Sequence, residues 1–339
     1  MSTRILSKQL LLGLLFLFVA SIVRGQDTAF ITFPSGTRLC DTASYRLVFS
    51  DDFDSTELDR THWHSYSVWS GMTPTEHDNW ADARVTSKQS IAKDENVVVK
   101  DGICNLILRK ETTSWRCDTC RQTFTRSYST GGIVTYYTRA YRFGKIEARI
   151  RFPKHRWAHG AFWTWPAESP SADKDLPELD IVEAYGYKGV PIAGNNGFQH
   201  AEWATHRWKP NNAYSLKQSR RFPRQTFAAW LRGAYFDFTK WHTYTAEWDE
   251  NRIGIYLDGE LVDEVWRYYC EDEKGRLQPS GCDPGTRRCY EDSRWPTSDY
   301  TSGSNVRLTT DIDADKIHGR EGEVGRMQVD YFRVWQRVK

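Results

Sequence analysis

Three carboxylates lie close together in the stretch PELDIVEA, residues 177–184. Its apolar and β-branched residues favour a β-strand, and alternate side chains of a strand share a face. Glu178 and Asp180 therefore point to one side, whereas Glu183 would point to the other. A β-bulge at Ile181-Val182 would add one residue and return Glu183 to the first side. The sequence thus predicts a bulged strand that presents all three carboxylates together.

Such a row suits the hydrolysis of glycosidic bonds, which needs two carboxyl groups beside the bond that breaks. A separation of roughly 5–5.5 Å gives retention through a covalent intermediate, and roughly 6.5–9.5 Å gives inversion. The backbones of Glu178 and Glu183 would lie about 13 Å apart, so their side chains must lean together, and spacing alone permits either outcome. Asp180 between them could help to separate their pKa values. The alternative is an acidic patch on an edge strand or a calcium-binding cluster.

The rest of the chain is typical of an all-β protein. Asp-Gly pairs at 101–102 and 258–259 predict two hairpins. In the final strand, Val329, Tyr331 and Trp335 are expected to share a face. No amphipathic helix, internal repeat or linker is evident, so residues 26–339 predict one domain, a sandwich of two antiparallel sheets. The expected strands are 96–100, 103–108, 145–152, 243–248, 252–257, 260–265 and 327–338.

The first 25 residues have the pattern of a secretory signal peptide. Arg4 and Lys8 precede an apolar run over 10–23, and cleavage before Gln26 fits the small-residue rule. The run is short for a membrane span, and no later segment is apolar enough to be one. We expect a secreted or periplasmic protein that does not associate with membranes. Removing residues 1–25 takes away three positive charges and changes the formal net charge of +2 to −1. This overall balance says nothing about partners, and we expect no nucleic-acid partner.

Seven cysteines in an exported chain predict disulfides. Cys270, Cys282 and Cys289 lie in a polar insertion that a disulfide could pin. Cys117-x-x-Cys120 could instead be half of a zinc site or a redox pair, although no second pair has matching spacing. Because the number is odd, at least one cysteine lacks a partner within the chain.

The spacing of the three carboxylates resembles the E-x-D-x-x-E signature of glycoside hydrolase family 16 in its bulged form. This form is found in laminarinases, agarases, porphyranases and κ-carrageenases, whereas lichenases carry the shorter E-x-D-x-E. The resemblance implies a curved β-jelly-roll sandwich of the concanavalin A type, with an open cleft on its concave face. Further segments that resemble the family in the same order are 49–54, 130–134, 141–149, 160–163, 238–244, 256–259 and 329–334.

The resemblance also implies roles for individual residues. Glu178 would be the nucleophile of a retaining mechanism, Glu183 the acid/base and Asp180 an assisting group. Trp163 is similar to the tryptophan that supports the sugar, and His200 to a histidine near the acid/base, although a core histidine would look the same. Other aromatic residues that could form sugar subsites, or belong to the core, are Trp157, Trp165 and Trp203. No cofactor is required, but a structural calcium could bind near Asp330 and the pair Asp51 and Asp52.

The substrate is expected to be a polysaccharide, and the charge pattern favours an anionic one. No Asp or Glu occurs between Trp203 and Phe236, whereas Arg and Lys recur there, including Arg207, and Arg156 lies in a second basic run. Arginine forks suit sulfate groups, so a sulfated red-algal galactan such as carrageenan, furcellaran, porphyran or agar is the first expectation. The segment 308–313 also departs from the apolar strand of laminarinases.

Three alternatives remain open at this point. The basic run could be a solvated loop, and the substrate could be a β-1,3-glucan, as for laminarinases. The chain could be a non-catalytic lectin-like sandwich, although all three carboxylates are present. A transglycosylase would use the same residues. A monomer is expected in each case.

Overall fold

The computed structural model describes residues 30–40, 44–65, 90–117, 121–135, 138–155, 157–167, 176–186, 200–208, 214–222, 236–292, 295, 303–312 and 321–338. Within these ranges the regular structure is β-strand apart from one 3₁₀ turn over Asp94–Asn96. No helix in these ranges has the length and apolarity needed to cross a membrane. The all-β prediction is confirmed.

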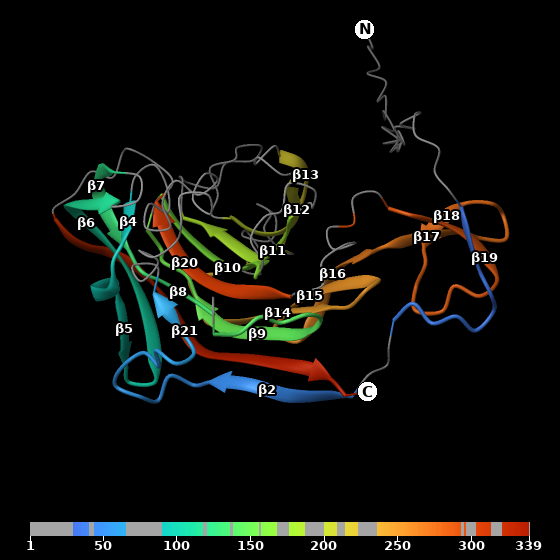
Figure 1. The fold of residues 1–339 in the computed structure, drawn as a ribbon, viewed down its shortest axis with the longest axis horizontal. Helices are drawn as coiled ribbons and strands as arrows, with labels where there is room; N and C mark the ends of the chain where they lie inside the picture. The colour runs from blue at the N-terminus through green and yellow to red at the C-terminus, as the bar shows by residue number, and fades with distance from the viewer. Residues whose placement is uncertain are drawn as a thin grey trace, which may run out of the picture.

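Two large, mainly antiparallel sheets lie one above the other (Figure 1). The upper one in this view is a seven-stranded sheet. In spatial order its strands are β13 (Tyr214–Arg221), β12 (His200–Trp208), β11 (Leu176–Tyr185), β10 (Ala158–Pro166), β20 (Ser304–Ile312), β8 (Gly132–Val134) and β3 (His64–Ser65).

The lower one is a ten-stranded sheet, and it contains the predicted hairpins. Its main path is β16 (Glu260–Trp266), β15 (Arg252–Leu257), β14 (His242–Trp248), β9 (Gly144–Arg151), β21 (Gly322–Arg337), β6 (Ile103–Cys117), β7 (Gln122–Thr130) and β4 (Ser90–Ala92). Two further strands join it, β2 (Tyr45–Asp51) beside β21 and β5 (Val97–Lys100) beside β6. In the described residues β4 and β7 form a parallel pair.

Local sequence explains why these strands form. Asp101 and Gly102 have φ of 54° and 72°, and Asp258 and Gly259 have 51° and 83°. Both central residues of each turn are thus left-handed, as two-residue hairpins with a type I′ turn require. In β9, odd positions are partly or fully exposed while even positions are buried, which confirms the predicted half-buried strand.

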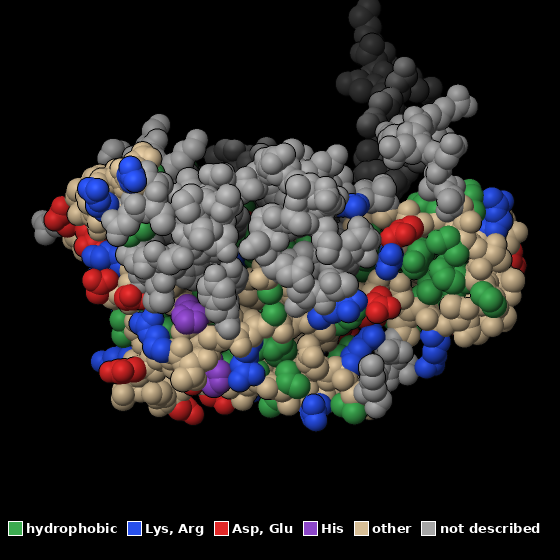
Figure 2. All heavy atoms as spheres, viewed as in Figure 1, with side chains coloured by type: hydrophobic (Ala, Val, Ile, Leu, Met, Phe, Trp, Pro, Cys, Tyr) green, Lys and Arg blue, Asp and Glu red, His purple; other side chains and the backbone are tan. Residues whose placement is uncertain are grey.

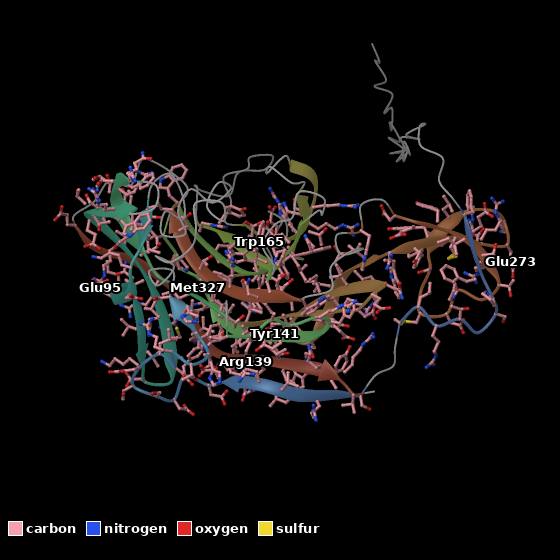
Figure 3. All side chains as sticks on the ribbon, viewed as in Figure 1. Glu95, Arg139, Tyr141, Trp165, Glu273 and Met327 are labelled. Atoms are coloured by element: carbon pink, nitrogen blue, oxygen red, sulfur yellow. A yellow bond between two sulfur atoms is a disulfide. The ribbon has the colours of Figure 1, made fainter. Side chains whose placement is uncertain are left out.

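The two sheets share one hydrophobic core. Phe162 of β10 and Phe332 of β21 are fully buried and meet edge to face, with ring centroids 6.2 Å apart. Met327 of β21 belongs to the same cluster, whereas Trp165 of β10 contacts Trp163 on the other side of its sheet (Figure 3). We call the side of the seven-stranded sheet that faces away from the core its outer face.

The prediction for the final strand is wrong in one respect. Val329 pairs with Ile150 and Tyr331 with Arg149, so the register of β21 shifts between them. Val329 is therefore buried in the core, whereas Tyr331 lies on the solvent side and is half-buried. A bulge in β21 thus separates two residues that regular alternation would have kept on one face.

A small third sheet, which the sequence did not predict, extends from one end of the sandwich (Figure 1). It joins the N-terminal part of the described chain to the polar insertion, in the order β1 (Ile31–Phe33), β19 (Arg287–Glu291), β17 (Tyr268–Glu271) and β18 (Leu277–Pro279). Figure 2 shows hydrophobic side chains gathered on this part of the surface, where Phe30, Ile31 and Leu277 are exposed.

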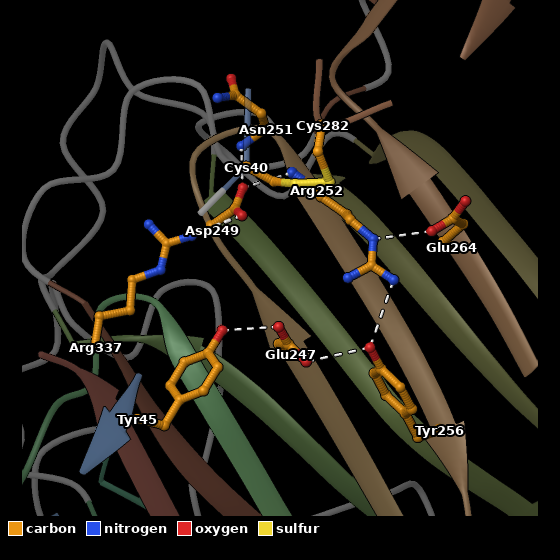
Figure 4. Close-up of a disulfide and its surroundings, with 10 residues drawn as sticks. All are labelled: Cys40, Tyr45, Glu247, Asp249, Asn251, Arg252, Tyr256, Glu264, Cys282 and Arg337. Carbon is orange, nitrogen blue, oxygen red and sulfur yellow. Dashed lines mark hydrogen bonds and ion pairs between the residues drawn. A yellow bond between two sulfur atoms is a disulfide. The ribbon is translucent and has the colours of Figure 1, made fainter. Parts of the chain in front are cut away.

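Disulfides hold the small sheet, as predicted for the insertion. Cys270 and Cys289 are paired across β17 and β19. Cys282 bonds to Cys40 and so ties the N-terminal segment to the insertion, next to the ten-stranded sheet (Figure 4). Cys104 is a buried free cysteine, and burial raises the pKa of its thiol far above the usual value. The side chains of the Cys117-x-x-Cys120 pair lie outside the described residues.

Candidate active site

The predicted bulge is present in β11. Against β10, Asp180 pairs with Trp163 and Glu183 pairs with Ala161. The two residues between these carboxylates therefore face only one residue, Phe162. Trp163 and Ala161 are two positions apart in β10 and share a face, so Asp180 and Glu183 share that face as well.

The strand on the other side of β11 gives the same result. The three carboxylates lie opposite alternate residues of β12, which share one face. The pairs are Glu178 with His206, Asp180 with Ala204 and Glu183 with Glu202. The extra residue is absorbed within β11, where Ile181 and Val182 are both fully buried in the core. All three carboxylates therefore lie on the outer face.

Glu183 has two close neighbours on that face. The Tyr185 hydroxyl donates a hydrogen bond to Glu183 Oε1 at 2.9 Å. His159 Nε2 lies 3.2 Å from the same oxygen, and its ring stacks on that of Tyr185 with centroids 4.7 Å apart. Burial, followed by the Glu183 charge, raises the pKa of Tyr185 well above its usual value, so this hydroxyl remains a donor.

Asp180 is buried and contacts a histidine. Its Oδ2 lies 2.8 Å from Nε2 of His206, whose exposure is only 8%. Glu178 lies in the same group, and the possible ligand atoms of the three residues are within 4.8 Å of one another. Two ligands of one zinc ion would be about 3.3 Å apart, so the shorter contact fits a hydrogen bond better, and we assign no metal here.

Trp163 is held beside this row by two groups from β20. Its indole Nε1 donates to Thr309 Oγ1 at 3.2 Å. The guanidinium of Arg307, which is 2% exposed, lies 4.8 Å from the ring centroid, a cation–π distance. Trp165 packs edge to face on Trp163 at 6.2 Å. The two tryptophans thus form a supported aromatic surface next to the carboxylates.

The structure corrects two of the predicted substrate contacts. Trp203 is in the core with 1% exposure, and its indole donates to Asp263 of the ten-stranded sheet. Arg207 pairs with Pro177, one position from Glu178, so it lies on the opposite face from the carboxylates. Neither residue belongs to the carboxylate face, because alternation places them on the other side of β12.

The other predicted contacts are placed only in part. Trp157 is half-buried and packs against a small cluster of Leu108, Tyr128, Ala158 and Ile312. The backbone of His200 pairs with Tyr185, but its side chain lies outside the described residues, as does all of Arg156. Their proposed roles stay predictions.

Sequence reasoning missed several residues of the site: His159, Tyr185, His206 and Arg307. Tyr185 could have been found, because it is two positions after Glu183 and must share its face once the bulge is assumed. The other three come from neighbouring strands. Their positions depend on strand register, for which adjacent residues carry no signal.

The carboxylates considered for calcium already have protein partners. Asp330 forms an ion pair with Arg149 at 2.5 Å, and Asp52 forms one with Arg333 at 2.9 Å. Asp51 accepts hydrogen bonds from the indole of Trp63 and from the backbone of Phe53. These contacts do not test the calcium site, which stays a prediction.

Comparison with known proteins agrees with this geometry. Residues 85–281, more than half of the chain, match the model for glycosyl hydrolases family 16. The chain is 23% identical over 296 residues to glucan endo-1,3-beta-glucosidase A1 of Niallia circulans, covering 87% of this chain but 38% of that relative. It therefore spans less than half the length of this relative.

Solved structures of the same fold include two with different named substrates. The endo-beta-1,3-glucanase of Pyrococcus furiosus superposes with a TM-score of 0.56 at 19% identity, over 91% of this chain and 98% of that one. Porphyranase B of Zobellia galactanivorans gives 0.55 at 15% identity, over 91% and 98%. These likenesses support the jelly-roll sandwich, and together with the family match they show that the chain belongs to glycosyl hydrolase family 16.

Proposed function

We propose that this protein is an endo-acting, retaining glycoside hydrolase that cleaves internal β-glycosidic bonds of a polysaccharide. The observation that supports it most is the bulge in β11, which brings Glu178, Asp180 and Glu183 to one face beside Trp163. A lectin-like sandwich would not need this row of carboxylates in the middle of a strand, where they are costly.

In the proposed mechanism, Glu178 is the nucleophile. Its carboxylate attacks the anomeric carbon while the glycosidic C–O bond breaks, and Glu183 gives its proton to the departing oxygen. Glu183 then takes a proton from water, which attacks the same carbon and releases Glu178. Asp180, in contact with His206, would assist by helping to separate the pKa values of the two glutamates.

The test compares the two glutamates. Glu178→Ala should be nearly inactive and partly rescued by azide, with a glycosyl azide of inverted anomeric configuration as product. Glu183→Ala should act mainly on substrates with activated leaving groups. Glu147→Gln, in the ten-stranded sheet, serves as the control and should keep full activity. Azide rescue of Glu183→Ala instead of Glu178→Ala would mean that the two roles are reversed.

For the substrate, we propose a neutral β-1,3-glucan first. The Niallia circulans relative is named as a glucan endo-1,3-beta-glucosidase. Two of the basic residues that suggested an anionic substrate point elsewhere, since Arg207 lies on the opposite face and Arg220 is paired with Asp263 at 2.8 Å. This reverses the order expected from the sequence.

A sulfated galactan is the second candidate, and two arginines favour it. Arg307 lies against Trp163, and the exposed Arg221 pairs with Glu202, which places it on the carboxylate face. Digestion of laminarin, κ-carrageenan, furcellaran, porphyran and agarose in parallel decides between them. Cleavage of laminarin alone supports the first candidate, and cleavage of sulfated galactans alone supports the second.

The protein's location is part of the proposal. The pattern of residues 1–25 fits export, and a polymer too large to enter a cell would require it. Detection of the protein outside the cytoplasm, with Gln26 as its first residue, checks this point.

A further inference from the structure

We propose that Tyr185 and His159 are positioning residues for the acid/base, which hold Glu183 Oε1 so that the transferable proton resides on Oε2. This inference rests on the proposed function and deepens it. It concerns groups that neither the sequence motif nor the family match singles out, and it assigns the two carboxyl oxygens of Glu183 different tasks.

The geometry around Oε1 carries the inference. The Tyr185 hydroxyl donates to this oxygen at 2.9 Å, and His159 Nε2 lies 3.2 Å from it. Both groups therefore act on one oxygen of Glu183. Because Oε1 accepts a hydrogen bond and faces a histidine, the negative charge of the carboxylate is favoured on Oε1. When Glu183 is protonated, the proton is therefore favoured on Oε2.

The two positioning residues also fix each other. They are register partners on β10 and β11, and their rings stack at 4.7 Å with 27° between the planes. The exposure of the His159 side chain is 22% and that of Glu183 is 14%, so neither is free to swing into solvent. A carboxyl group held in this way is ready for proton transfer before the substrate arrives.

Other charged groups face the same carboxylate. They are Glu178 and Asp180 on β11, Glu202 and His206 on β12, and Asp311 on β20, which pairs with His159. Negative charge on neighbouring carboxylates opposes ionisation of Glu183, whereas the Tyr185 donor favours it. Removing the donor should therefore make Glu183 keep its proton to a higher pH.

The test is the pH dependence of kcat/KM for Tyr185→Phe on the polysaccharide that the wild-type protein cleaves. Its basic limb, which reports loss of the acid/base proton, should move upward by about one to two pH units. The kcat/KM of Tyr185→Phe at its optimum pH should fall by about tenfold relative to wild type, because the carboxyl group of Glu183 is less well held.

Tyr45→Phe is a matched control. The Tyr45 hydroxyl donates to Glu247 Oε1 at 2.8 Å in the ten-stranded sheet, so the same chemical change is made away from the carboxylate face. Its pH profile should superimpose on that of the wild type. The leaving group of an activated aryl glycoside departs without being protonated. On this substrate Tyr185→Phe should have the same kcat/KM as the wild type, which shows that the variant is folded.

His159→Ala tests the second residue. Because both residues act on one oxygen, the double variant with Tyr185→Phe should lose little more than the worse single variant. A Tyr185→Phe profile identical to wild type, or strictly additive losses, overturns the inference while leaving the proposed function intact. A wild-type protein that cleaves none of the polymers overturns the proposed function itself.

Discussion

The two large sheets both carry carboxylates on the sides that face away from the core, but the partners differ. In the ten-stranded sheet many of the carboxylates are paired with permanent cations. The ion pairs are Lys145–Glu147, Arg149–Asp330, Arg252–Glu264, Arg333–Asp52 and Arg337–Asp249. In the seven-stranded sheet the described partners are His206 for Asp180, and His159 and Tyr185 for Glu183.

This difference separates a structural surface from a reactive one. A carboxylate beside arginine or lysine stays ionised over the whole working range of pH. A histidine can gain or lose its own proton near neutrality, and a tyrosine donates without adding a charge. Acid/base catalysis requires a carboxyl group that can exist in both forms, and in the seven-stranded sheet Glu183 has both a tyrosine donor and a histidine at one oxygen. Figure 4 shows a carboxylate of the ten-stranded sheet that also has tyrosine donors, Glu247, which lies between two tyrosines near the Arg252–Glu264 pair.

The largest effect is expected from changing the length of the bulge. Insertion of one alanine after Ile181 leaves three residues between Asp180 and Glu183. In a regular strand Glu183 then stays on the outer face but lies one two-residue step, roughly 6–7 Å, further from Glu178, which should abolish hydrolysis. Deletion of Ile181 should give a regular E-x-D-x-E strand that keeps the three carboxylates on one face. Hydrolysis assays and thermal unfolding of both variants check this. A deletion variant as inactive as the insertion variant, yet stably folded, would contradict it.

The next prediction compares two His–Asp contacts that have the same nitrogen–oxygen distance. His206 contacts Asp180 at 2.8 Å in the seven-stranded sheet, and His242 contacts Asp258 at 2.8 Å in the ten-stranded sheet. His206→Ala should lower kcat by about tenfold or more, the loss expected for one hydrogen bond to a charged group. His242→Ala should leave kcat within about twofold, since exposed pairs are worth about 1 kcal/mol or less. Steady-state kinetics of both variants measures the two values of kcat. An equal loss of kcat in His206→Ala and His242→Ala would contradict the prediction.

A third comparison concerns two tryptophans on opposite faces of the seven-stranded sheet. Trp203→Ala should lower the free energy of unfolding by roughly 3–5 kcal/mol, because it leaves a cavity in the core. Trp163→Ala should mainly raise KM, because its ring lies beside the carboxylates. Denaturant unfolding and kinetics of the two variants measure these effects. A large rise in KM for Trp203→Ala at unchanged stability would instead support the sequence-based prediction that Trp203 contacts the substrate.

The smallest effect concerns Asp249, the buried carboxylate of the ten-stranded sheet. Burial raises its pKa above the ordinary 3.8, although hydrogen bonds from Asn251 and Arg252 and the charge of Arg337 oppose this. A raised pKa means that the native state binds the proton more tightly, so this group stabilises the fold at low pH and the contribution is lost as the pH rises through its native pKa. The stability of Asp249→Asn relative to wild type should therefore improve between about pH 3 and pH 7. Urea unfolding at both pH values tests this, and a relative stability that falls with pH would contradict it.

Local features of the sequence determined much of the fold. Alternation in β9 and the two Asp-Gly turns were correct because side-chain period and turn conformation depend on adjacent residues. The bulge in β11 was also predictable, since three carboxylates on a core strand are acceptable only if all of them reach the same outer face. The register shift in β21 was not predictable. Val329 and Tyr331 are both acceptable strand residues whether or not they share a face, so the local sequence does not indicate a bulge there.

The tertiary structure decided what lies opposite each strand. His206 faces Glu178 and Trp203 enters the core because the register of β12 against β11 is set by packing over the whole sheet. The small sheet likewise pairs residues near Phe33 with residues near Arg287, far apart in sequence. The sequence by itself thus determined which carboxylates gather on one face and on which kind of strand they lie. Only long-range pairing decided which histidines, tyrosine and arginine surround them, because strand register is a property of two segments and is encoded in neither alone.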